Sequence, residues 1–356
     1  MIGVLVVNAV GYTHFPDSLH VVPPPVPADS TAAWVVQALL LTLLQAKAYP
    51  LLAFLFGWSF GHSFQARGET ASTHRRRRLW RLLLIGLLHG SLIYAGDVLT
   101  AYALAGFLLL SSVRWRLRRL VRLWWVLLAA SVVCAALQAW ALMELSAAAR
   151  VDPSILEQGL GYGQVQTLLA HVSITWPTYL WTQLLLTPVM LPVLMSLMVS
   201  GLLVSRLRGF THRRWRTVWS RQARWALPLG LGLNAFVSWK MMQTRAVVDS
   251  APSVWSAAQL LVGPVLTFGL VALVAAARPG WLLALAPVGR RSLSLYLAGS
   301  LSFLLVYGGS GLALGPSLGS VATLAVAIGL ALVLSFGAVL SVRLGRTGVL
   351  ERWLSS

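Results

Sequence analysis

Two ionisable residues, His89 and Asp97, lie where two strongly apolar runs meet, at residues 79–93 and 98–113. The whole chain has only nine Asp and Glu residues. A carboxylate at the edge of a membrane span must reach water, meet a partner or stay protonated, which makes Asp97 a candidate functional residue. Gly96-Asp97 is also favourable turn and N-cap chemistry, so capping of the second helix is the alternative interpretation. The two roles do not exclude each other.

The residues around Asp97 could form a polar relay with it. His89 precedes Asp97 by about two helical turns, and a polar ring inside a span must find a hydrogen bond. It either forms a proton-linked pair with Asp97 or only joins two helices. Tyr94 and Tyr102 belong to the same stretch and are the other structural or relay candidates.

The start of the chain contributes three further candidates, Asn8, His14 and His20. Histidine is the side chain that most often acts as a general base near neutral pH, and an amide can hold an oxyanion. A single histidine in a loop is usually just solvated, so neither His14 nor His20 indicates a function by itself.

Motifs of soluble enzymes are not evident. The glycines of the stretch 159–163 do not follow a strand, as a nucleotide-binding motif requires. The His, Cys, Asp and Glu residues do not show the spacing of a metal site. We therefore expect no metal and no covalently bound cofactor.

Composition predicts the class of protein. The chain has 356 residues, of which 58% are hydrophobic and 10% charged, with a mean hydropathy of +0.76. A soluble domain carries roughly 25% charged residues. The long apolar runs predict an all-α, polytopic membrane protein that forms one transmembrane domain over residues 1–356. The lipid bilayer is then its first partner, while its oligomeric state is left open.

The net charge of +19 comes from basic blocks between the apolar runs rather than from a nucleic-acid-binding patch. Cytoplasmic loops carry such an excess of Lys and Arg. With both termini cytoplasmic, only Lys47, Arg150, Lys240 and Arg245 fall outside, four of the 28 Lys and Arg. We therefore expect no nucleic-acid partner and predict a multi-pass membrane protein with its basic loops on the cytoplasmic side.

About ten crossings fit this charge pattern. A short first helix at 1–13 is expected to have lost its cytoplasmic end, and a helix at 32–46 to lie along or enter the outer surface. Pro177, Pro188 and Pro192 predict a kinked or broken helix. Gly57 and Gly61 predict a close helix contact. The other nine crossings are expected at residues 49–64, 79–93, 98–113, 124–145, 174–205, 227–239, 254–277, 293–309 and 318–342.

Several motifs resemble the YeiB family of bacterial inner-membrane proteins, which share a domain of unknown function, DUF418. The stretches that carry the resemblance are GVLVVN at 3–8, YPLLAFLFGWSF at 49–60, LIGLLH at 84–89, DVLTAYALAG at 97–106, GRRSLSLY at 289–296 and GVLERW at 348–353. Two departures stand out. The family's charged lead-in to the first helix is absent, and Ser294-Leu-Tyr296 stands where the family often has Thr-Asn-Tyr, which changes the polar contacts expected there.

The resemblance implies a multi-pass location in the bacterial inner membrane and two alternative functions. YeiB-like proteins have been proposed as transporters, and they are distantly similar to transmembrane acyltransferases of the heparan-glucosaminide acetyltransferase type. In that branch an Asn on the first helix precedes a catalytic His by about a dozen residues, which corresponds to Asn8 and His20, with His14 as a second candidate. The basic loops, with Arg75, Arg76, Arg77 and Arg78, would suit the phosphates of acyl-CoA.

Two hypotheses follow from the residues and the resemblance together. The first is a membrane acyltransferase that moves an acyl group from cytoplasmic acyl-CoA to an extracytoplasmic saccharide or lipid-linked acceptor. The second is a transporter or exporter of a small solute in which His89 and Asp97 carry a proton.

Overall fold

The computed structural model describes residues 2–14, 30–67, 70–151, 165–243, 251–346 and 348–355, and within these ranges every regular element is a helix. The elements are α1 (Ile2–His14), α2 (Thr31–Leu43), α3 (Ala48–Arg67), α4 (Thr70–Leu92), α5 (Leu99–Ser112), α6 (Leu117–Val151), α7 (Leu168–Arg206), α8 (Trp215–Gln243), α9 (Ala251–Ala277), α10 (Ala286–Arg290), α11 (Ser292–Tyr307), α12 (Ser320–Arg343) and α13 (Val349–Ser355), with 3-10 turns η4 (Gly280–Leu285) and η5 (Gly315–Ser317). The all-α prediction is confirmed.

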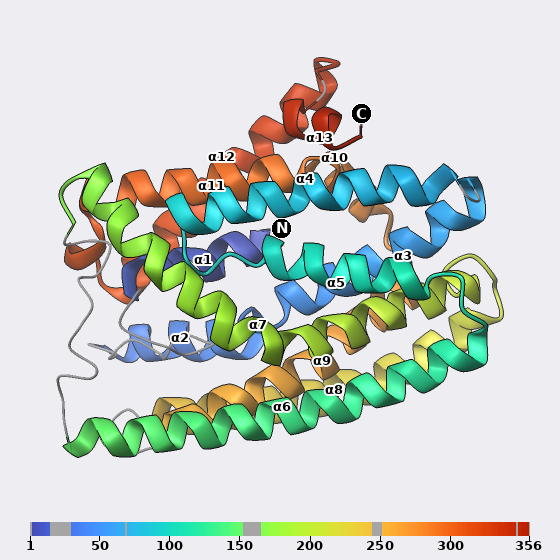
Figure 1. Ribbon diagram of the computed structural model, residues 1–356, viewed down its shortest axis with the longest axis horizontal. Coiled ribbons are helices and arrows are strands. Elements are labelled where there is room, and N and C mark those ends of the chain that lie inside the picture. Colours follow the sequence, from blue (N-terminus) through green and yellow to red (C-terminus); the bar gives the residue numbers. More distant parts are fainter. Residues whose placement is uncertain are drawn as a thin grey trace.

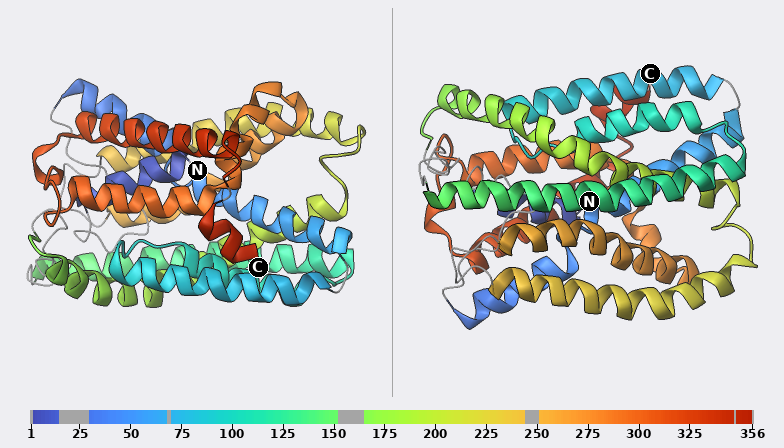
Figure 2. Two further views of the ribbon diagram at one scale, coloured as in Figure 1. Left: turned by 90° about the horizontal axis from the view of Figure 1, so that it is seen from above. Right: turned by 60° about the horizontal axis from the view of Figure 1, so that its bottom comes forward.

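The long helices run side by side along the longest axis of the molecule (Figures 1 and 2). The connections α5–α6 and α7–α8 lie at one end, and the α4–α5 corner and the α11–α12 connection lie at the other (Figure 1). Since both connections at the first end carry basic residues, we call it the basic end. α1 begins near the middle of the molecule and runs towards the opposite end.

Five stretches of the described residues are long and apolar enough to cross a membrane, which agrees with a multi-pass membrane protein. They are Thr31–Gln65, Leu117–Ala141, Leu168–Arg206, Val254–Ala277 and Val321–Arg343. The shorter apolar helices α5 and α11 do not meet this length, since about 20 residues are needed to span 30 Å of hydrocarbon. The prediction of about ten crossings stays a prediction.

The basic blocks that were expected to be loops are largely helical. α4 begins at Thr70, so Arg75–Arg78 lie on its first turns, α6 begins at Leu117, and α8 begins at Trp215. Arg and Lys are good helix formers, and hydropathy alone cannot tell where a helix continues beyond the apolar zone. The helices therefore begin earlier than the crossings expected to start at residues 79, 124 and 227.

The helix expected at 32–46 and the crossing expected at 49–64 form one broken apolar stretch. α2 ends at Leu43 and α3 begins at Ala48, and between them Ala46 adopts a left-handed backbone with φ 60°. Lys47 is only 3% exposed at this break, and its Nζ donates to the carbonyl of Leu41 at 2.6 Å. This carbonyl belongs to the last turn of α2, where carbonyl groups lack a helical partner.

The close contact predicted from Gly57 and Gly61 is present between α3 and α7. A Cβ atom at Gly57 would lie 1.8 Å from the carbonyl oxygen of Met198, and one at Gly201 would lie 1.9 Å from that of Phe54. Backbone therefore touches backbone at this crossing. α7 runs as one helix through its three prolines and bends along its length (Figure 1).

Candidate functional site

Asp97 lies fully buried in the corner between α4 and α5. Its Oδ2 accepts the backbone N–H of Thr100 at 3.0 Å, which is the bond of a helix N-cap. Its Oδ1 accepts from His89 Nδ1 at 2.8 Å, and both side chains are at most 1% exposed. The expected cap and the expected contact with His89 are therefore both present, on separate oxygens.

Two glycines of α4 allow this corner to close. A Cβ atom at Gly86 would lie 2.6 Å from Thr100 Oγ1 and 3.1 Å from Asp97 Oδ2. A Cβ atom at Gly90 would lie 2.2 Å from the ring of Tyr179. Both positions therefore require glycine so that α5 and α7 can approach the turn of α4 that carries His89.

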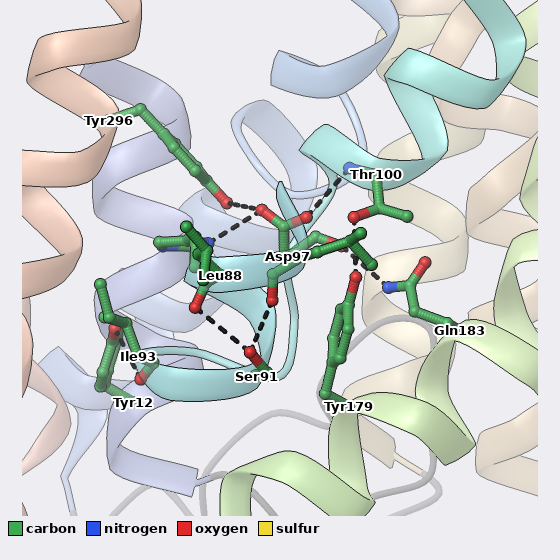
Figure 3. A network of polar contacts seen from close by, with 11 residues as sticks. Tyr12, Leu88, Ser91, Ile93, Asp97, Thr100, Tyr179, Gln183 and Tyr296 are labelled. Atoms are coloured by element: carbon green, nitrogen blue, oxygen red, sulfur yellow. Dashed lines mark hydrogen bonds and ion pairs between the residues drawn. The ribbon is translucent and has the colours of Figure 1, made fainter. Parts of the chain in front are cut away.

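Distant helices add further partners to Asp97 (Figure 3). Tyr296 of α11 donates its hydroxyl to Asp97 Oδ1 at 3.3 Å, and Gln183 of α7 donates to the Asp97 carbonyl at 3.3 Å. Tyr179 of α7 shares a 2.7 Å hydrogen bond with Thr100 Oγ1. The polar groups of α4, α5, α7 and α11 thus form one buried network. Such a network is expected, because a polar group that is buried without a hydrogen bond costs free energy.

The contact with Asp97 orients the His89 ring through Nδ1. If the carboxylate is ionised, it can only accept, and Nδ1 then carries the proton that points at Asp97. Nε2 is buried and has no hydrogen-bond partner among the described residues. A histidine that is oriented through one nitrogen by a carboxylate and leaves the other nitrogen open is the arrangement of a general base or a proton carrier.

A pocket of about 140 Å³ adjoins this network. A cavity of roughly 150 Å³ holds a molecule the size of benzene, so this pocket can hold one small ring or a comparable group. It lies between α1, the α2–α3 break, the α4–α5 corner and α7. Its polar lining comes from Asn8, Gln45, Tyr49, Tyr94, Asp97, Thr182, Gln183 and Thr187, and the other side chains are apolar or small.

Two polar atoms at this pocket are buried without a partner. Asn8 Nδ2 and Tyr49 Oη make no hydrogen bond to any described residue. A buried donor without a partner costs about 1–3 kcal/mol. Both groups therefore favour a bound molecule that offers oxygen atoms. Among the described residues, no Lys or Arg lines the pocket to select an anion.

The structure thus brings Asn8 of the first helix together with Tyr94 and Asp97 of the stretch 89–102, and all three line the pocket. His89 lies behind Asp97 rather than in the lining. Tyr102 is buried elsewhere and donates its hydroxyl to the carbonyl of Tyr49. Tyr102 therefore supports a lining residue and is not part of the hydrogen-bond network on Asp97.

The other predicted site residues lie away from the pocket or outside the described residues. His20 is outside the described ranges, and His14 ends α1 with a side chain that the structure does not describe. Arg75 is buried on α4, donates to Ser59 O at 2.8 Å and to Ser63 Oγ, and stacks on Phe60. Arg76, Arg77 and Arg78 are exposed, so they stay the candidates for phosphate contacts.

Sequence reasoning missed Gln183 and Tyr179 of α7 and undervalued Tyr296. Gln183 is a polar amide in a long apolar run, which is the signal that could have identified it. Tyrosine is common in membrane helices and gives no such signal. The departure at 294–296 keeps its polar contacts, since Tyr296 meets Asp97 and Ser294 Oγ donates to Glu351 at 2.6 Å.

Comparison with known proteins supports the family resemblance. Residues 204–354 match the family described as "Protein of unknown function (DUF418)". The chain is also similar to the uncharacterized protein YxaH of Bacillus subtilis strain 168, with 38% identity over 84 residues. That alignment covers 23% of this chain and 21% of YxaH, so the chain matches about a fifth of that relative's length. No solved structure matches the chain.

Proposed function

We propose that this membrane protein, whose residues 204–354 match the DUF418 family, is an acyltransferase whose acceptor binds in the pocket beside Asp97. The unpaired amide of Asn8 at the pocket is the observation that carries the proposal. An N–H donor fixed in a dry site is what stabilises the oxyanion of acyl transfer. The lining is apolar with a few amide and hydroxyl groups, which suits a neutral hydroxylated acceptor with an apolar part.

The reaction balances with an acyl-CoA donor. The acceptor hydroxyl oxygen attacks the thioester carbonyl carbon, the C–S bond breaks, and the products are an ester and free coenzyme A. The hydroxyl proton must go to a base, and it returns to the leaving thiolate. In this proposal the base is the His89–Asp97 pair: Asp97 lines the pocket and can take the proton, and His89 Nδ1 is held to it at 2.8 Å.

Release of coenzyme A by the purified protein tests this proposal. Acetyl-CoA or a longer acyl-CoA serves as donor and an alkyl glucoside as acceptor, and a thiol reagent measures the free coenzyme A. We expect Asn8→Ala to lower the rate about 100-fold, the usual effect of removing one oxyanion donor. Ser111→Ala is the matched control, because the Ser111 hydroxyl only bonds to the carbonyl of Leu108 in its own helix.

Two comparisons identify the base. His89→Gln should abolish transfer if the buried pair is the base, whereas His20→Ala should abolish it if the base lies in the segment that follows α1. A wild-type protein that releases no coenzyme A with any of these donors contradicts the proposal. A fully active Asn8→Ala protein contradicts the role of the pocket.

Transport of a small solute is the second candidate, and the break between α2 and α3 favours it. Transporter sites often lie where discontinuous helices meet near the middle of the membrane. Gln45 and Ala46 of this break line the pocket, and the buried His89–Asp97 pair could carry a proton. Sealed proteoliposomes with an imposed pH gradient separate the two candidates, because proton flux coupled to solute uptake needs no acyl donor.

A further inference from the structure

The helices that give Asp97 its two side-chain partners are joined by a third element, the short helix α13. His89 belongs to α4 and Tyr296 to α11. Within the described ranges, α13 packs against both α4 and α11, whereas these two are not among the closely packed helix pairs. A change in how α13 packs would therefore shift α11 relative to α4, and with them Tyr296 relative to His89.

On α11, the contact is a carboxylate at the first turn. Glu351 accepts the backbone N–H of Ser294 at 3.0 Å and the Ser294 hydroxyl at 2.6 Å, so each of its oxygens has one donor. A negative charge at the start of a helix is also favoured by the helix dipole. A Cβ atom at Gly348 would lie 2.0 Å from Glu351 Oε2, so glycine at 348 leaves room for the carboxylate.

On α4, the contact is an arginine that holds the other side of α13. The Arg81 guanidinium lies over the Trp353 ring at 5.2 Å and donates to the Trp353 carbonyl. Leu354 is 5% exposed and belongs to the main core together with Leu79 and Leu82 of α4. α13 is therefore attached to α4 by charge, ring and apolar contacts at once.

These attachments lie close to the network along each helix. Ser294 and Tyr296 are two residues apart, about 3 Å along α11, and Arg81 and His89 are eight residues apart, about 12 Å along α4. The bond from Tyr296 to Asp97 is 3.3 Å long, near the upper limit of a hydrogen bond. A displacement of α11 by well under an ångström would break it.

We infer that α13 is a clasp that sets the position of α11 against α4 and thereby keeps the Tyr296 hydroxyl on Asp97. Glu351 is then a positioning residue that acts on the Asp97 site through Ser294 and Tyr296 of α11. The inference rests on the proposed function only for its effect on catalysis. It would also explain why the stretches 289–296 and 348–353 contact each other through Ser294 and Glu351.

The reactivity of a thiol in the pocket tests the clasp without any acyl transfer. Val98 lines the pocket, and Val98→Cys in a Cys134→Ala background provides the single thiol. We expect Glu351→Ala and Gly348→Ala to raise its rate of reaction with N-ethylmaleimide about two- to tenfold, as for the loss of one hydrogen bond. Glu351→Gln should restore most of the wild-type rate, because an amide can still accept from the Ser294 N–H.

A double mutant tests the route through Tyr296. Tyr296→Phe should raise the rate to a similar extent, and Tyr296→Phe with Glu351→Ala should raise it no further than the larger single effect. Arg278→Ala is the matched control: it removes a 2.7 Å bond between the residue that follows α9 and Phe210 O in the α7–α8 connection, and neither residue lines the pocket.

The outcomes are distinct. Additive effects of the two changes, an unaltered rate in both Glu351→Ala and Gly348→Ala, or an equal increase in Arg278→Ala would each overturn the clasp. If the rates change as expected while no variant or wild-type protein releases coenzyme A, the clasp stands and the acyltransferase proposal fails. If coenzyme A is released but the rates of thiol reaction do not change, the acyltransferase proposal stands and the clasp fails.

Discussion

Asp97 divides its two roles between its two oxygens. Oδ2 caps α5 through the Thr100 N–H at 3.0 Å, and Oδ1 takes His89 Nδ1 at 2.8 Å and the Tyr296 hydroxyl at 3.3 Å. The cap needs one neutral acceptor, whereas the second oxygen meets two donors in a buried place. A negative charge is therefore needed only for the contacts of Oδ1 with His89 and Tyr296, since Asn or Ser caps a helix about as well as Asp.

Asp97→Asn should consequently separate the roles. The amide oxygen of Asn can keep the Thr100 N–H, while its NH₂ group cannot accept from His89 or Tyr296. We expect normal expression and stability but a loss of activity of about tenfold or more, roughly 1.4 kcal/mol. The measurement is the rate of coenzyme A release or of solute uptake, whichever the wild-type protein shows.

His89→Ala provides the check on this interpretation. If the two residues act as one network, the loss in the double mutant should be smaller than the sum of the single losses. A fully active Asp97→Asn protein would reduce this corner to a well-capped turn. The functional centre would then have to be sought in the segment that follows α1, where His20 lies.

At the scale of the helices, the crossing of α3 and α7 fixes one wall of the pocket. Gly57 and Gly201 each place their Cα hydrogens against a carbonyl of the other helix, and Leu52 of α3 and Met190 of α7 line the pocket nearby. Contacts of small residues are the usual way in which membrane helices approach closely. Widening this crossing should therefore change both stability and the pocket.

Gly57→Ala and Gly201→Ala should each destabilise the protein. In an open helical position, Gly→Ala stabilises by about 0.5–1 kcal/mol, whereas overpacking costs about 1–3 kcal/mol. The backbone atoms at 1.8 and 1.9 Å cannot move without shifting a whole helix, so the loss should prevail. Thermal unfolding of the purified protein should show a lower Tm for both variants.

Gly329→Ala and Gly337→Ala in α12 are the matched controls, since no atom lies within 4 Å of a Cβ at either position. Their Tm should be unchanged or slightly higher. If Gly57→Ala and Gly201→Ala have the same Tm as the two α12 variants, the α3–α7 crossing tolerates a wider separation than its geometry implies.

The sequence predicted the local parts of the site and missed the distant ones. His89 and Asp97 are eight residues apart across one turn, so helix and cap rules sufficed to pair them. Tyr296 and Asp97 are 199 residues apart, and no pattern within one helix indicates which distant helix will lie beside it. The break at Ala46 was equally hidden, because an apolar run gives no signal for a left-handed residue within it.

The whole molecule has an uneven distribution of charge along its long axis. The connections at the basic end carry residues such as Arg114, Arg208 and Arg213, whereas the described α11–α12 connection at the opposite end has no charged residue. The pocket lies towards this opposite end, beside the α4–α5 corner. If the basic end is cytoplasmic, as the positive-inside rule predicts, the pocket belongs to the extracytoplasmic half.

Cysteine labelling of intact cells with a membrane-impermeant maleimide tests this orientation, in a Cys134→Ala background. Cysteines at Pro24, Gln158 and Leu312 should react from outside, and Leu312 is already 67% exposed in the α11–α12 connection. Cysteines at Ser72 and His212 should react only after the membrane is permeabilised. Labelling of position 212 in intact cells would show that the orientation is the reverse of the predicted one. The pocket would then lie in the cytoplasmic half of the membrane, on the same side as a cytoplasmic acyl-CoA donor.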